Sequence, residues 1–226
     1  MKRLILAGML LAAAPIAHAA AQNWNDTFEA TAAGHRVGNP QASVKLIEFV
    51  SYTCPHCADF EKQADGPLRI GFIHDGSVEV EVRHVIRNPV DLAAVLATEC
   101  GDPQKFFGNH RRMLHTQDDW LARAREATPA QQQRWNSGPV GQRMRAIASD
   151  LGFYDLMAAR GLTVSELDRC LNDEARAQAI VDLSNASSAE FAVPGTPSFA
   201  VNGELLEGVH TWQSLEPALT SAKQGE

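Results

Sequence analysis

The chain has 226 residues and a formal net charge of −7, because 27 acidic residues outnumber 20 basic ones. A chain of this length can bury an ordinary hydrophobic core in one domain, or in one domain that carries a large insertion. The acidic balance and the lack of a basic cluster argue against contact with a phosphate backbone, so we expect no nucleic-acid partner.

The first residues have the three regions of a secretory signal peptide. Met1-Lys2-Arg3 is charged, the run from Leu4 to Ile16 is apolar, and Ala17-His18-Ala19 supplies the small residues of a cleavage site. The apolar run is too short to span a bilayer comfortably. We therefore expect export of the chain and cleavage after Ala19, with the next two alanines as less favoured positions.

Residues 44–86 predict two strands separated by a helix. Val44 to Val50 is rich in β-branched and aromatic residues, which indicates a buried strand, although it contains the carboxylate Glu48. A helix is expected from about Pro55 to Ala64, and Gly66-Pro67 is expected to break or kink it. Val78 to Ile86 alternates valine with charged residues, as strands do. A strand-helix-strand unit places its two strands parallel.

The rest of the chain predicts a helical block followed by a hairpin. From about Pro89 to Glu190 the sequence is alanine-rich, and its glycines and prolines divide it into five or six short helices. Thr163-Val164-Ser165-Glu166 fits a capping box at the start of one of them. Asn202-Gly203 joins two strand-like runs, Ser198 to Val201 and Glu204 to Gly208, and is a strong hairpin signal. A closing helix is expected from about Trp212 to Ala222.

Cys54 and Cys57 stand three residues apart at the expected start of the first helix. Residues with this spacing lie on one face of a helix, so their sulfur atoms can form or break a bond with little backbone movement. The helix dipole and unpaired amides favour a thiolate at Cys54, which we expect to be the more exposed of the two. Cys57 would resolve a mixed disulfide, Pro55 would restrict the loop, and His56 would further stabilise the thiolate.

Zinc binding is the main alternative for a Cys-x-x-Cys pair. Structural zinc sites use four ligands, and the sequence has no second pair with ligand spacing, since His110 and His115 are five residues apart rather than four. A purely structural bridge is also disfavoured, because so small a loop adds little stability. We therefore expect no metal site, and no cofactor beyond a redox-active Cys54–Cys57 disulfide.

The tetrad Cys54-Pro55-His56-Cys57 and the order of elements resemble the DsbA-like branch of the thioredoxin superfamily. The resemblance covers nearly all of the chain from about Val44 onward. It implies an α/β protein with a thioredoxin fold, in which a mixed central sheet is flanked by helices and carries a large inserted all-helical domain. The implied segments are a signal peptide (1–19), an N-terminal extension (20–43), a first thioredoxin-like half (44–88), the inserted helical domain (89–190) and a second half (191–226).

Two further features carry the same resemblance. Glu48 stands six residues before Cys54, where this superfamily has a buried acid that assists proton transfer at the second cysteine. A carboxylate that merely reaches the sheet edge is the alternative. Thr196-Pro197 precedes the hairpin, and in similar proteins this proline is cis and packs beside the cysteines, so that the preceding backbone binds substrate. An ordinary proline at the start of a strand is the alternative there.

Cys100 and Cys170 both lie near apolar residues of the helical block. We predict a structural disulfide between them, which closes a loop of about 70 residues and contributes at most about 4 kcal/mol. Two buried unpaired thiols are the alternative, because free cysteine packs as a small hydrophobic residue.

The resemblance implies a periplasmic protein disulfide oxidoreductase. As an oxidase it would donate the Cys54–Cys57 disulfide to unfolded, reduced secreted proteins, and a membrane partner of the DsbB type would reoxidise it. The short segment before Val44 leaves no room for the assembly domain of the dimeric isomerases, which favours a monomeric oxidase. Thr196 favours an isomerase or reductase, because the oxidases that this chain resembles have valine before the cis-proline. A non-enzymatic copper or zinc carrier that uses Cys54, His56 and Cys57 is a third possibility.

Overall fold

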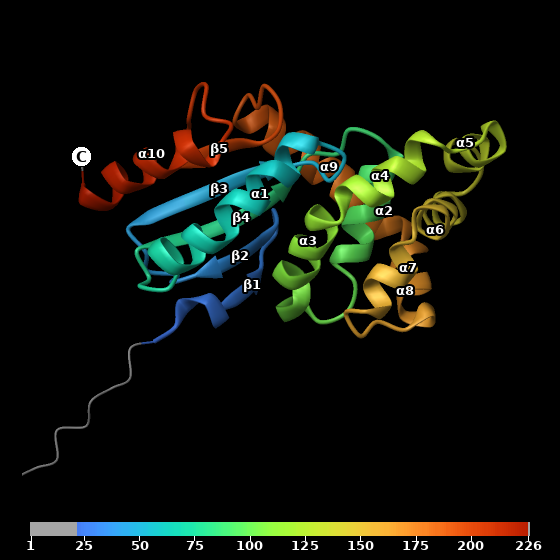
Figure 1. Cartoon of the computed structure of the whole chain (residues 1–226), viewed down its shortest axis with the longest axis horizontal. Coiled ribbons are helices and arrows are strands. Elements are labelled where there is room, and N and C mark those ends of the chain that lie inside the picture. The colour runs from blue at the N-terminus through green and yellow to red at the C-terminus, as the bar shows by residue number, and fades with distance from the viewer. Residues whose placement is uncertain (1–21, 226) are drawn as a thin grey trace, which may run out of the picture.

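The computed structural model describes residues 22–225, so the predicted signal peptide lies outside the described residues. Figure 1 shows two parts, a sheet with helices α1 and α10 along it and a block of helices beyond one end of that sheet. We call the first part the sheet unit, and we call Pro89–Glu190 the helical insert. Within residues 22–225, no helix has both the length and the apolar composition needed to cross a membrane.

The sheet unit is built on a mixed sheet with the strand order β1-β2-β4-β3-β5-β6. β3 and β4 are parallel, as the strand-helix-strand unit predicted, and every other neighbouring pair is antiparallel. The predicted fold class is thereby confirmed. The strands are β1 (Phe28–Ala30), β2 (His35–Gly38), β3 (Val44–Val50), β4 (Val78–His84), β5 (Ser198–Val201) and β6 (Glu204–Leu205).

The N-terminal extension contributes strands that the sequence analysis did not predict. β2 pairs with β4, and β1 pairs with β2 at the edge of the sheet. Both strands are short, and only β2 is mostly buried. Neither has the long period-two pattern that identifies β4, which explains why the sequence analysis missed them.

Helices α1 (Pro55–Leu68) and α10 (Trp212–Gln224) cover one face of the sheet. Their buried apolar residues pack with those of β3 and β4 in one core cluster. Alternate residues of a strand point to opposite faces, so Glu48 shares this face with Leu46, whereas Ile47 and Phe49 pack against the segment after the insert. The carboxylate predicted in a buried strand therefore lies beneath α1.

The first helix was predicted to end near Ala64, before Gly66-Pro67, and this prediction is wrong. α1 continues to Leu68 and is followed by a π-helical segment, Arg69–Ile73. A proline inside a helix costs about 3 kcal/mol, while each large apolar side chain that becomes buried contributes about 1.5–3 kcal/mol. Leu68, Phe72 and Ile73 are all buried in the core of the sheet unit. Their packing offsets the hydrogen bond that Pro67 cannot make.

The helical insert, which the structure describes completely, contains eight α-helices rather than the five or six predicted. The helix boundaries that were not predicted contain neither glycine nor proline. Only Thr116 separates α3 from α4, and only Asn172-Asp173 separates α8 from α9. The helices are α2 (Pro89–Thr98), α3 (Phe106–His115), α4 (Gln117–Arg125), α5 (Pro129–Asn136), α6 (Val140–Leu151), α7 (Phe153–Ala158), α8 (Val164–Leu171) and α9 (Glu174–Glu190).

Two local predictions for the insert and the hairpin are confirmed. Thr163 and Glu166 form the capping box at the start of α8. Asn202 and Gly203 have φ values of 51° and 90°, as a two-residue turn with positive φ at both positions requires. The second strand of the hairpin is shorter than predicted, because β6 ends at Leu205. The closing helix extends two residues beyond the predicted Ala222.

Candidate active site

Cys54 and Cys57 lie at the start of α1. Cys54 is the N-cap residue with an extended backbone, Pro55 follows in the first turn, and the amide of Cys57 donates to the Cys54 carbonyl oxygen at 3.1 Å. Both cysteines are free thiols. Pro55 and His56, which separate them, are exposed. The local sequence thus places two thiols in the first turn of a helix whose positive end faces Cys54.

Residues 142 positions away in the sequence cover Cys54. The Thr196-Pro197 peptide bond is cis, and the Cys54 thiol donates to the Thr196 carbonyl oxygen at 3.1 Å. The Thr196 hydroxyl oxygen is buried and has no hydrogen-bond partner. Cys54 is the more exposed of the two cysteines, as expected, but only by a small margin, because 3% of Cys54 and none of Cys57 is accessible. His210 also contacts this segment, because its Nδ1 donates to the Pro197 carbonyl oxygen at 2.7 Å.

The pKa values of the two thiols are shifted in opposite directions. A hydrogen bond from the Cys57 side chain, together with Thr196 and the amides of Cys57 and His56, lowers the pKa of Cys54 to about 5 against the opposing effect of burial. Burial raises the pKa of Cys57, and the neighbouring Cys54 sulfur raises it further. At neutral pH Cys54 is therefore the thiolate and Cys57 the thiol. This is the division of roles that disulfide exchange requires.

The helical insert holds the loop that precedes Cys54. Asp91, in the first turn of α2, accepts hydrogen bonds from the Ser51 hydroxyl and from both the amide and the hydroxyl of Thr53, at 2.8–2.9 Å. Gln117 of α4 donates to the carbonyl oxygens of Tyr52 and Cys54 at 2.6 and 2.8 Å. Asp91 and Gln117 are completely buried. Sequence reasoning missed both residues, because nothing in the helical pattern showed which side chains face the distant loop.

Glu48 is 3% exposed, and one of its carboxylate oxygens has no hydrogen-bond partner. Burial raises the pKa of this carboxyl well above its ordinary value, and repulsion from Glu61 of α1 raises it further. Burial likewise raises the pKa of Glu61 to about 7. The negative charge of Glu48 in turn adds to the raised pKa of Cys57. Glu48 is thus a buried acid electrostatically linked to the inner thiol.

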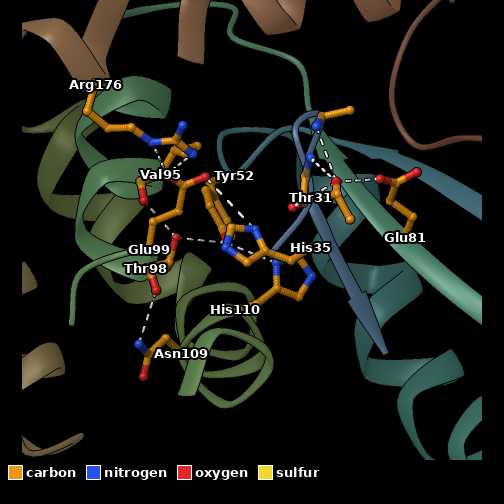
Figure 2. A network of polar contacts seen from close by, with 12 residues as sticks. Thr31, His35, Tyr52, Glu81, Val95, Thr98, Glu99, Asn109, His110 and Arg176 are labelled. Carbon is orange, nitrogen blue, oxygen red and sulfur yellow. Dashed lines mark hydrogen bonds and ion pairs between the residues drawn. The ribbon is translucent and has the colours of Figure 1, made fainter. Parts of the chain in front are cut away.

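A polar network connects this region to the insert, and Figure 2 shows its central part. The Tyr52 hydroxyl lies 3.1 Å from the Thr98 hydroxyl and 2.9 Å from Nδ1 of His110 in α3. His110 is 2% exposed, and burial lowers its pKa to about 3. Its other ring nitrogen, Nε2, lies 3.9 Å from a Glu61 oxygen. Glu48, Glu61 and His110 form a group within residues 22–225 whose atoms could hold a metal ion.

One cavity lies beneath α1, and another borders the active-site loop. The first, of about 180 Å³, is lined by Glu48, Glu61 and His110 among others. The other, of about 390 Å³, lies between Thr53 and the insert and is lined by Val90, Leu121 and Trp135 among others. The first cavity is lined by buried polar groups, and the second offers a more apolar surface beside Thr53.

The structure therefore brings most of the predicted site residues together. Thr196 and Cys54 are in contact, and Glu48 influences Cys57 through its charge. The remaining predicted pair, Cys100 and Cys170, lies in the insert and forms a disulfide with a Cα–Cα distance of 5.7 Å.

Comparison with known proteins places this site in a family. A family model described as thioredoxin matches residues 30–221. The structure titled protein-disulfide isomerase from Novosphingobium aromaticivorans is 44% identical and has a TM-score of 0.81, over 84% of this chain and 98% of that one. Wolbachia pipientis α-DsbA1 has a TM-score of 0.66 over 84% of this chain and 90% of that one, and at 19% identity it shows a common fold.

A curated relative from Rickettsia typhi, provisionally named a protein-disulfide oxidoreductase, is 27% identical over 84% of this chain. The chain spans 62% of the length of that relative. The match to the family model extends from β1 to the last helix, and the structures with the same fold carry the DsbA name. The chain therefore belongs to the thioredoxin family and has the fold of its DsbA-like members.

Proposed function

We propose that the protein is a thiol-disulfide oxidoreductase that introduces disulfide bonds into exported proteins through Cys54 and Cys57. The observation that carries this proposal is the lowered pKa of Cys54, at the N-terminus of α1 and in contact with Thr196. A stabilised thiolate is a good leaving group, and stabilising the reduced form makes the corresponding disulfide a stronger oxidant.

In the proposed reaction, a substrate thiolate attacks the Cys54 sulfur of the Cys54–Cys57 disulfide. The bond between the two cysteines breaks, and Cys57 leaves and takes up a proton, for which Glu48 is the proposed donor. A second substrate thiolate then attacks the substrate sulfur of the mixed disulfide and releases Cys54 as a thiolate. The substrate loses two electrons and gains one disulfide, and the protein is left as the dithiol. A membrane partner of the DsbB type is the proposed oxidant that restores it.

The contact surface for substrate is proposed to be the segment Thr196-Pro197 together with the cavity beside Thr53. The backbone of Thr196 already lies at hydrogen-bonding distance from Cys54, and the cavity wall carries apolar side chains such as Trp135. Reduced, unfolded proteins expose both backbone and apolar groups, so they suit such a surface. We also propose a periplasmic location and a monomeric state, since the residues before β3 that the structure describes join the sheet instead of forming a separate assembly domain.

An isomerase is the second candidate. Threonine precedes the cis-proline, and the N. aromaticivorans structure at 44% identity carries the name of an isomerase. An isomerase uses the dithiol to attack wrong disulfides, which the low pKa of Cys54 also permits.

Both candidates are tested with the purified protein and two substrates. A reduced peptide with two cysteines, supplied with oxidised glutathione, reports disulfide formation, and a scrambled disulfide protein reports isomerisation. An oxidase accelerates the first reaction much more than the second, and an isomerase does the reverse. If the protein accelerates neither reaction and the Cys54→Ser variant behaves like the wild type, the proposed function is wrong.

A further inference from the structure

Three buried side chains that are distant in the sequence converge beneath the active site. Glu48 comes from β3, Glu61 from α1 and His110 from α3, and they are 3%, 7% and 2% exposed. One oxygen of each carboxyl group and one ring nitrogen of His110 lie within 4.8 Å of one another. Because α3 belongs to the helical insert, this cluster joins the insert to the sheet unit.

Hydrogen bonds determine which nitrogen of His110 faces the two carboxyl groups. The Thr98 hydroxyl donates to the Val95 carbonyl oxygen at 3.0 Å, and the Tyr52 hydroxyl donates to the Thr98 hydroxyl at 3.1 Å (Figure 2). The Tyr52 oxygen is then free to accept the Nδ1 hydrogen of His110 at 2.9 Å. A neutral imidazole has a single N–H group, so Nε2 carries a lone pair.

That lone pair is unused. Nε2 of His110 and one oxygen of Glu48 are buried and have no hydrogen-bond partner. A buried polar atom without a partner is costly, so such atoms are uncommon and call for a ligand, a water molecule or a proton. Here both atoms belong to residues whose ligand atoms lie within 4.8 Å of one another.

The cavity of about 180 Å³ opens onto this cluster and provides room for an ion and its water ligand. Its wall includes four carboxyl groups, those of Asp26, Glu48, Glu61 and Asp65, against two guanidinium groups. One of these guanidinium groups, that of Arg111, lies 3.6 Å from Asp65. Above the Glu61 pKa of about 7, even with Glu48 protonated, three carboxylates face two guanidinium groups, so at mildly alkaline pH the wall of the cavity favours a cation over an anion.

We propose that Glu48, Glu61 and His110 bind one divalent transition-metal ion, with zinc as the best fit, in a form of the protein in which Glu48 does not donate a proton to Cys57. Zinc accepts imidazole nitrogen and carboxylate oxygen together, and sites with three protein ligands keep a fourth position for water. Calcium and magnesium favour sites made of oxygen alone, which His110 does not suit. Tetrahedral zinc with bonds of about 2.0 Å brings its ligands to about 3.3 Å from one another, so the cluster contracts by about 1 Å when the ion binds.

The test is equilibrium dialysis of the purified protein, without a histidine tag, against Zn²⁺ at mildly alkaline pH. The protein is used with Cys54 and Cys57 joined as a disulfide, because free thiolates would bind zinc themselves. We expect one zinc ion per chain. Failure of the oxidised protein to bind zinc would overturn the site but would leave the proposed disulfide exchange untouched, since no exchange takes place in this measurement.

Matched variants show which residues bind the zinc ion. Glu61→Gln and His110→Gln are expected to weaken zinc binding by at least about 100-fold, because each removes a direct ligand. Tyr52→Phe removes the hydrogen bond that orients His110 and should weaken binding by about 10-fold. His115→Gln changes an exposed histidine of the same helix and should leave the affinity unchanged.

Thermal unfolding controls for folding defects. A ligand that binds only the folded state raises the unfolding midpoint as its concentration increases. Zinc should therefore raise the midpoint of the wild type and of His115→Gln, but not that of Glu61→Gln. A folded Glu61→Gln protein that binds zinc as tightly as the wild type would show that the ion is held elsewhere.

Discussion

The molecule contains two cysteine pairs. One lies at the N-terminus of a helix, and the other lies at the C-termini of two helices. Cys54 caps the N-terminus of α1 and stands three residues from Cys57, and both are free. Cys100 follows the end of α2, Cys170 lies in the last turn of α8, and the two form a disulfide across 70 residues. The positive end of a helix stabilises a thiolate, and the negative end disfavours one. The helix ends thus favour attack and release at Cys54 and a persistent bond at Cys100–Cys170.

The surroundings of the two cysteine pairs also differ. Cys57 is affected by the buried acid Glu48, and Cys54 contacts the Thr196 carbonyl group, beside a buried hydroxyl that has no hydrogen-bond partner. Cys100 belongs to the same apolar core cluster as Cys54 and Cys57, and Cys170 packs against that cluster. Both pairs are thus in or against one apolar cluster, and the helix end and the neighbouring polar groups are what distinguish them.

Removal of a reactive sulfur gives the largest expected effect. Cys54→Ser should reduce disulfide formation in a reduced peptide by at least about 1,000-fold, because the group attacked by substrate is lost. Cys57→Ser should instead accumulate a mixed disulfide at Cys54, which mass spectrometry of the intact protein detects. If Cys54→Ser retains most of the wild-type rate, the pair at the start of α1 is not the reacting one.

Glu48→Gln should have the next largest effect. The amide cannot transfer a proton to or from Cys57, so the exchange rate should fall by up to about 100-fold while the fold is kept. Glu79→Gln is the matched control, because Glu79 is a buried carboxylate of the neighbouring strand that pairs with Lys45 at 3.0 Å. Equal rates for Glu48→Gln and the wild type would exclude a proton-transfer role for Glu48.

Thr196→Val should have a smaller effect, confined to the acidity of Cys54. Valine has nearly the same shape as threonine but removes the hydroxyl that can donate to the thiolate, and a hydrogen bond to a charged group contributes about 1.5–3 kcal/mol. The pKa of Cys54 should therefore rise by about 1 to 2. Ultraviolet absorbance of the thiolate measures this shift, and an unchanged midpoint would show that the hydroxyl plays no part.

Removal of the second pair should affect exchange least. The double variant Cys100→Ala/Cys170→Ala should keep the exchange rate of the wild type but lose up to about 4 kcal/mol of stability, because the closed loop is long. Urea unfolding measures the loss. A large fall in exchange rate, in a variant that remains folded under the assay conditions, would mean that the two pairs do not have separate roles.

Features that depend only on residues close together in the sequence could be predicted from the sequence. The tetrad, the capping box at Thr163 and the turn at Asn202-Gly203 all depend on contacts within a few residues. The cis bond at Pro197 was expected only through the resemblance to a known family. Asp91, Gln117 and His110 were not predicted as parts of the site, because they reach it from the helical insert and only the tertiary packing shows where their side chains point.

The pKa of Cys54 tests the account most directly. The folded reduced protein is expected to lose its thiolate absorbance as the pH falls through about 5, and Cys54→Ser should lack this transition. Because this pKa lies below the ordinary value of 9.0, the stability that the thiolate adds is present in alkaline solution and is lost as the pH falls through the folded-state pKa. A midpoint near 5 supports activation of Cys54 by the Cys57 side chain, by Thr196 and by the amides of the first turn of α1. A midpoint near 9 would contradict the account, because Cys54 would then be an ordinary thiol.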